Sequence, residues 1–248
     1  FSVGVPMEWI KNYVKDQSYE PGNKKTDAMY TFLRDAKMTE KRKLTDFGQF
    51  MLKRDFNDEK TWAILLCNLA YSPAFNWYIT NIPFDVDYTS ETAALDLADA
   101  SKHAIGEFWN AFKTILDSNS CLQLIGFGIP EIESKTTKMG DVKKKMLSLR
   151  RTAWMNPDSL TILYSLYKFA EACGGYYQFS LSTLLDDSIE RDGVSPTRIF
   201  WLGEDEMKRI LNGLSSNYPD FISASFTLDL DNITLRSEKT ADDVLQLF

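Results

Sequence analysis

A succession of short amphipathic segments, each opened by a helix-capping residue, constrains the fold of this chain most strongly. Thr45, Asp58, Ser101 and Ser180 each precede a segment with apolar residues at helical spacing. Hydroxyl and carboxylate oxygens at such positions accept hydrogen bonds from the first amides of a helix, which have no partner inside the helix. The chain is therefore predicted to be mainly α.

Short extended segments interrupt the helical pattern. Leu122–Ile129 is predicted to be a strand, and Phe221–Thr227 with Asn232–Arg236 is predicted to form a hairpin around an Asp-rich turn. Three helices followed by a hairpin is the order of a winged helix-turn-helix unit, and residues 61–129 show a similar order. The predicted fold class is mainly α with short β-hairpins, built from tandem winged-helix-like units.

Charge is distributed unevenly along the 248 residues. The net charge is -7, yet Lys135–Arg151 holds seven basic residues against Asp141 alone. This basic segment has few large apolar side chains. We therefore predict a helical, winged-helix-like part over 1–130, a basic linker or exposed hairpin over 131–155, and a C-terminal winged-helix-like unit over 156–248.

The basic segment is the strongest indication of a partner. Lys143, Lys144, Lys145, Arg150 and Arg151 are candidate contacts to nucleic acid or to an acidic protein surface. The alternative is a solvated linker, since charge runs usually face water. The overall negative charge and the near-neutral helices that would serve as recognition helices favour a protein partner over nucleic acid.

No catalytic or metal-binding pattern is found. His103 is the one histidine, and no His or Cys cluster has zinc spacing. Gly126-Phe127-Gly128 lacks the third glycine of a phosphate-binding loop and precedes a proline instead of a helix. We expect no catalytic residue and no bound metal or cofactor in this chain.

An acidic stretch is the second candidate site. Ser180 is predicted to start a helix that continues to Glu190, which would place Asp186 and Glu190 on one face. Arg198 could hold a phosphate or a carboxylate there, or it could pair with Asp186 or Asp192. The alternative is a solvated helix end followed by an Asp-Gly turn.

Cysteine usage and hydropathy predict a cytoplasmic chain. Cys67, Cys121 and Cys173 are odd in number and lie among apolar residues, which indicates buried thiols in a reducing compartment. No apolar run reaches the roughly 18 residues that span a bilayer. The start at Phe1 resembles no signal peptide, and we expect the numbering to begin inside a longer protein.

Several stretches resemble a known family. They are similar to the C-terminal region of long bacterial proteins of the phosphoadenosine phosphosulfate (PAPS) reductase family. The resemblance covers essentially the whole chain, and Asp187–Phe200 is its most specific part. The matching stretches are Phe32–Ala36, Trp62–Ile82, Asn156–Glu171, Leu184–Phe200 and Tyr218–Thr227.

The resemblance implies an accessory role. Proteins of that family carry an upstream nucleotide-binding domain of the ATP-pyrophosphatase type and an iron–sulfur segment. The region similar to this chain is a domain of unknown function, also found near DNA phosphorothioation genes. The family's nucleotide loop and cluster cysteines are absent from this sequence. The implied function is therefore a non-catalytic domain that docks a partner or positions a substrate, with a nucleic-acid-binding module as the alternative.

Overall fold

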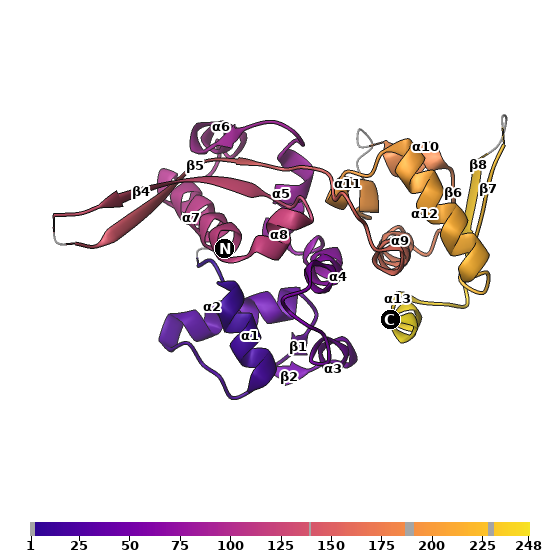
Figure 1. Cartoon of the computed structure of the whole chain (residues 1–248), viewed down its shortest axis with the longest axis horizontal. Helices are drawn as coiled ribbons and strands as arrows, with labels where there is room; N and C mark the ends of the chain where they lie inside the picture. Colours follow the sequence, from indigo (N-terminus) through magenta and orange to yellow (C-terminus); the bar gives the residue numbers. More distant parts are fainter. Residues whose placement is uncertain (1–2, 139, 187–190, 228–230) are drawn as a thin grey trace.

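The computed structural model describes residues 3–138, 140–186, 191–227 and 231–248. The chain begins with three helices and a two-stranded turn that pack beneath the rest of the molecule (Figure 1). Thr45 caps α3 by accepting a hydrogen bond from the amide of Gly48, as the sequence predicts. These elements are α1 (Met7–Lys15), α2 (Asn23–Asp35), β1 (Thr39–Glu40), β2 (Lys43–Leu44) and α3 (Asp46–Met51).

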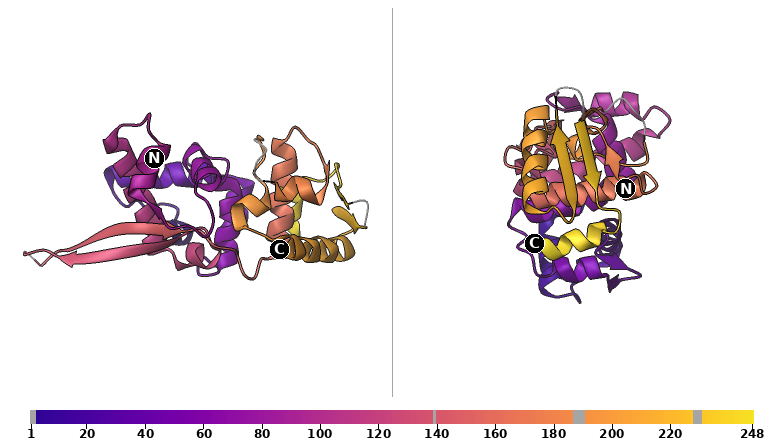
Figure 2. Two further views of the ribbon diagram at one scale, coloured as in Figure 1. Left: turned by 90° about the horizontal axis from the view of Figure 1, so that it is seen from above. Right: turned by 90° about the vertical axis from the view of Figure 1, so that its right-hand side faces the viewer.

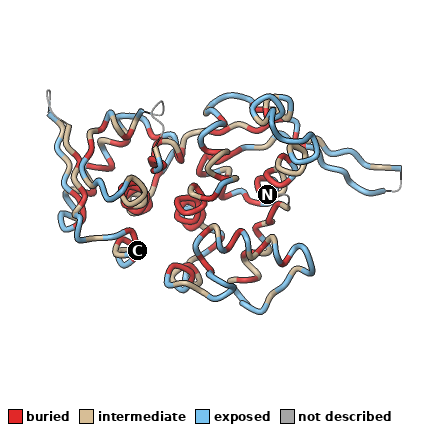
Figure 3. The backbone as a smooth tube through the Cα atoms, turned by 180° about the vertical axis from the view of Figure 1, so that it is seen from behind, coloured by how far each residue is buried: buried red, intermediate tan, exposed pale blue. Residues whose placement is uncertain are grey.

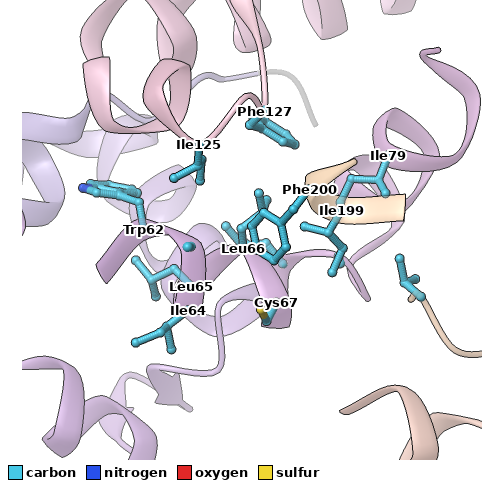
Figure 4. Packing of buried hydrophobic residues seen from close by; sticks show 14 of the residues in the cluster. Trp62, Ile64, Leu65, Leu66, Cys67, Ile79, Ile125, Phe127, Ile199 and Phe200 are labelled. Carbon is cyan, nitrogen blue, oxygen red and sulfur yellow. The ribbon is translucent and has the colours of Figure 1, made fainter. Parts of the chain in front are cut away.

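Helix α4 (Glu59–Leu69) lies at the centre of the hydrophobic core. Asp58 caps it, and every residue from Thr61 to Leu69 is buried. A helix that is apolar on all sides must be covered on all sides. Figure 4 shows Trp62, Leu66 and their neighbours packed against residues from distant parts of the chain, including Phe127 and Phe200.

The first unit follows α4 and ends in the longest hairpin of the described residues. Helix α7 packs on one side of the strands, and Figure 1 shows β4 and β5 continuing beyond it. We call this β4–β5 hairpin, residues 129–150, the arm. The elements are α5 (Pro73–Asn81), β3 (Tyr88–Thr89), α6 (Ser90–Asp96), α7 (Lys102–Ser118), α8 (Ser120–Leu124), β4 (Ile129–Thr136) and β5 (Val142–Arg150).

The second unit occupies the opposite end of the molecule (Figure 2). Its hairpin packs on α12, and its last helix lies against α9. The elements are α9 (Ser159–Ala172), β6 (Gln178–Phe179), α10 (Leu181–Leu185), α11 (Pro196–Phe200), α12 (Glu204–Asn217), β7 (Ile222–Phe226), β8 (Asp231–Leu235), α13 (Ala241–Val244) and the 3-10 turn η1 (Leu245–Leu247).

The two units share one strand arrangement. Each has a short strand, then helices, then a hairpin, and the hairpin's second strand pairs with the short strand. The resulting orders are β3-β5-β4 and β6-β8-β7, and every ladder is antiparallel. Within the described residues the fold is therefore mixed α/β, with many helices and small antiparallel sheets.

Arg151 joins the two units. Its guanidinium is fully buried and donates to the carbonyl oxygens of Ile79 and Ile82 at the end of α5. It also donates to those of Arg198 and Ile199 in α11. Carbonyls at a helix end lack partners inside the helix, so one side chain satisfies the ends of two helices.

Two predicted elements are wrong. Leu122–Ile129 was expected to be a strand, but α8 runs to Leu124 and the chain turns at Gly126 before β4 begins. Gly126 has φ +75°, and a Cβ there would meet the carbonyl oxygen of Thr152 at 2.0 Å. The helix predicted to run from Ser180 to Glu190 ends at Leu185, because Asp186 is extended.

The three cysteines are free thiols, and burial raises the pKa of Cys67 to about 12. Cys67 and Cys121 are buried, whereas Cys173 is partly exposed. None of the helices in the described part of the chain combines the length and the apolar character needed to cross a bilayer.

Candidate interaction surface

The arm is a two-stranded ribbon whose outer part is exposed. Residues 131–155, expected to be a basic linker or exposed hairpin, contain most of it. Its register runs from Ile129 opposite Arg150 to Thr136 opposite Val142, with a bulge near Glu131 and Ile132. Figure 3 shows the far part of the arm as exposed on both strands. Its side chains are therefore presented to solvent away from the core.

Helix α7 holds one face of the arm. Met146 is buried, and its carbonyl oxygen accepts a 3.1 Å hydrogen bond from the indole of Trp109. Lys113 donates to the carbonyl oxygen of Lys144 at 3.2 Å. The ammonium of Lys144 in turn pairs with Asp117 at 2.8 Å. Lys144 therefore fastens the arm to α7, and its charge is already compensated.

The opposite face of the arm carries a cluster of exposed cations. Successive side chains of a strand point to opposite faces, so Lys143 and Lys145 lie on the face away from Lys144. Lys135 lies directly across from Lys143, and Glu133 lies across from Lys145. Lys135 pairs with Glu133 at 3.0 Å, whereas Lys143 and Lys145 make no ion pair within the described ranges. Lys135, Lys143 and Lys145 therefore form one patch, which we call the lysine face.

The lysine face contains an unfavourable pair. Like charges directly opposite each other across two strands lower stability, by roughly 0.2–1 kcal/mol relative to small neutral residues. Lys135 and Lys143 occupy such a position. A bound anion would relieve this repulsion, so the register favours an anionic partner.

Arg150, at the base of the arm, is engaged by neighbouring carboxylates. It pairs with Asp87 at 2.8 Å and with Asp85 at 3.3 Å. Its hydrogen bond to Asp87 lowers the pKa of that carboxyl and raises the pKa of Arg150. Arg150 therefore adds little free positive charge to the lysine face.

Arg151 does not belong to the surface at all. The sequence places it beside Arg150 as a candidate contact, but its exposed fraction is 0%. Its guanidinium lies 3.9 Å from the centre of the Phe84 ring, which stacks on Trp201 at 5.1 Å. The prediction for Arg151 is corrected: the last turns of two helices supply carbonyl acceptors that hold this side chain inside the protein.

The acidic candidate site lies only partly within the described residues. Asp186 lies just beyond the end of α10 in an extended conformation, so it is not part of that helix. Glu190 lies outside the described residues. Arg198 is in α11, where its amide donates to Ser195 and its carbonyl accepts from Arg151. The side chain of Arg191 donates to the carbonyl oxygen of Thr183 in α10.

The two helices in the position of recognition helices, α7 and α12, carry paired charges. In α12, Lys208 pairs with Glu204 at 2.7 Å and Arg209 with Glu206 at 2.6 Å. His103 in α7 is exposed and lies 3.4 Å from Glu107. No group of three or more His, Cys, Asp or Glu side chains in the described ranges could hold a metal ion.

Comparison with known proteins identifies no relative of this chain. No protein-family model matches the chain. Neither the curated proteins nor the solved structures contain a significant match to it. The resemblance to the PAPS reductase family therefore stays a prediction.

Sequence reasoning missed one member of the lysine face. Lys135 was counted in the basic segment but not among the candidate contacts, because its partners on the face depend on strand register. The alternation of residues 129–136 and 142–150 was the signal that could have grouped it with Lys143 and Lys145.

Proposed function

We propose that this chain is a non-catalytic interaction module that docks an acidic protein surface with the lysine face of the arm. The partner can be a separate protein or an upstream domain of the same polypeptide. We further propose that the two units are winged-helix-like, with the arm as the wing of the first. The shared strand order supports this assignment.

One observation carries the proposal. The chain has a net charge of -7, yet the lysine face gathers three cations against one carboxylate, Glu133, on an exposed ribbon that extends past α7 in Figure 1. A projecting patch of charge opposite to the rest of the molecule steers an acidic partner to one place and orients it.

The resemblance described above supplies the proposed context. The module would belong to a PAPS-reductase-like sulfur-transfer protein of the cytoplasm. Any sulfonucleotide or ATP and any iron–sulfur cluster would then be bound by other parts of that protein. The chain itself would position the partner or the substrate for chemistry performed elsewhere.

Charge reversal on the arm tests the proposal. In the source cell, Lys143→Glu with Lys145→Glu is expected to lower recovery of the partner at least tenfold, measured by quantitative mass spectrometry after nuclease treatment. Lys24→Glu with Lys102→Glu is the matched control, since both lysines are exposed, lie on other elements and make no ion pair in the described residues. Equal recovery from both double variants would reject the arm as the docking surface.

A nucleic-acid-binding module is the second candidate, because Lys135 opposite Lys143 forms a site where a phosphate would fit between two cations. Binding of a labelled duplex or single strand should then weaken with salt, with a slope of about 0.9 per phosphate neutralised. Lys143→Glu should reduce that slope by about 1. A salt-independent signal, or none at low salt, would exclude this candidate.

A further inference from the structure

A cavity of about 550 Å³ lies between the N-terminal helices and the second unit. The end of α2, strand β1 and the start of α3 form one side of it, and α9 with α13 forms the other. This volume is within the range of about 300–1,000 Å³ typical of small-molecule sites. The cavity is separate from the arm, and the proposed function does not use it.

Buried polar groups form part of the lining of the cavity. Asn68 accepts a 2.9 Å hydrogen bond from the hydroxyl of Tyr164 and donates to the carbonyl oxygen of Ala36. Thr39 is only 2% exposed, and its hydroxyl has no hydrogen-bond partner. A buried polar group without a partner costs about 1–3 kcal/mol, so a hydrogen bond from a ligand to Thr39 would remove that cost.

The backbone beside the cavity is strained. Lys37 has φ +62°, a conformation that usually requires glycine at the end of a helix. Its amide donates to the carbonyl oxygen of Arg34, and the amide of Met38 donates to that of Leu33. These bonds end α2 and turn the chain toward β1 beside the cavity.

The lining of the cavity holds three cations and three carboxylates, and two of the cations already have an ion-pair partner outside the lining. Arg34 pairs with Asp35 at 3.1 Å, and Lys168 pairs with Glu171 at 3.8 Å. Lys37 then remains as the cation of the lining without an ion pair in the described residues. Three carboxylates of the lining also make no such pair: Glu40, Asp46 and Asp242.

An aromatic wall completes the cavity. Phe47 lines it and stacks on Tyr164, with ring centres 6.1 Å apart. Aromatic faces and carboxylates together are the groups that recognise organic ammonium ions. This chemistry matches an organic cation.

We infer that this cavity binds a small organic amine, with its ammonium group facing Asp46 and Asp242 and its apolar part on Phe47. The hydroxyl of Thr39 accepts a hydrogen bond from the ligand. The site thus adds a small-molecule binding activity to a chain whose proposed role is docking.

Three probes of similar size, one cationic, one neutral and one anionic, show whether binding depends on the charge of the ligand or only on its shape. Calorimetric titration of the whole chain with 2-phenylethylamine should give saturable heat, whereas neutral 2-phenylethanol and anionic phenylacetate should not. Asp46→Asn with Asp242→Asn should weaken amine binding at least tenfold, and Asp220→Asn, an exposed carboxylate outside the cavity, should not. Equal binding of the amine and the alcohol, or no heat at about 10 mM amine, would overturn the inference.

Thr39→Val gives an independent test. It should leave the melting temperature of the ligand-free protein unchanged or raise it, because the lost hydroxyl has no partner. Amine binding should weaken about fivefold, the value of one hydrogen bond. Thr197→Val removes another buried hydroxyl without a partner, away from the cavity, and should leave binding unchanged. Equal effects of the two variants on binding would contradict the assignment.

Discussion

The arm and the β7–β8 hairpin have the same place in units of the same strand order, yet they differ in length and charge. The strands of the arm have 8 and 9 residues, with five basic and two acidic side chains. Those of the second hairpin have 5 each, and Asp231 is their single charged residue.

The way each hairpin is held differs as well. The second hairpin lies along α12, where the amide of Ala224 donates to the hydroxyl of Ser215. Among the described residues α7 holds the arm as far as Lys144, and Figure 3 shows the strands beyond it as exposed. One topology thus serves two purposes: the second hairpin closes a core, while the arm presents a charged surface.

Substitution of Arg151, the buried residue at the base of the arm, is expected to give the largest change in the free energy of unfolding. Arg151→Met leaves four carbonyl groups without a donor and should lower the free energy of unfolding by about 3 kcal/mol or more. Arg150→Met, one residue earlier, loses exposed ion pairs only and should change the denaturation midpoint little. Urea denaturation of both variants measures the contrast. Similar midpoints would show that Arg151 does not join the units.

The anchor of the second hairpin should matter less. Tyr167 donates from its hydroxyl to the carbonyl oxygens of Phe221 and Arg236, which flank the two strands. Tyr167→Phe keeps the ring and should cost about 1–2 kcal/mol in the same assay. Partner recovery should remain unchanged, because the arm is in the other unit. Lower partner recovery at unchanged stability would contradict the claim that the arm docks the partner and the second hairpin only stabilises the core.

The smallest effect concerns the repulsion on the lysine face. Lys135→Thr removes one of two opposed cations and should raise stability by about 0.2–0.5 kcal/mol in the absence of a partner. The same change should weaken docking, so stability and binding should move in opposite directions. The gain in stability should shrink at high salt, where the repulsion is screened. A destabilised variant would show that Glu133 already compensates the pair.

Features that depend on neighbouring residues could be predicted from the sequence. Thr45, Asp58 and Ser101 cap helices as expected, because a cap needs only its own hydroxyl or carboxylate and an amide two or three residues away. The strands at Ile222–Phe226 and Asp231–Leu235 likewise follow from alternation.

Features that depend on distant contacts could not be predicted. In the sequence Arg151 is the last residue of a basic run. It is buried because carbonyl oxygens at the ends of α5 and α11 accept its hydrogen bonds. The lysine face depends on the register between β4 and β5, and the cavity depends on α2 and α3 meeting α9 and α13. Such pairings are set by tertiary packing rather than by local pattern.

Site-specific photocrosslinking in the source cell tests the docking surface most directly. A photoreactive amino acid at Glu133, whose side chain is 39% exposed across from Lys145, is compared with one at Ser225, exposed on the second hairpin. We predict a protein adduct from position 133, lost on Lys143→Glu with Lys145→Glu, and none from position 225. No adduct from position 133, or equal adducts from both positions, would contradict the assignment of docking to the arm.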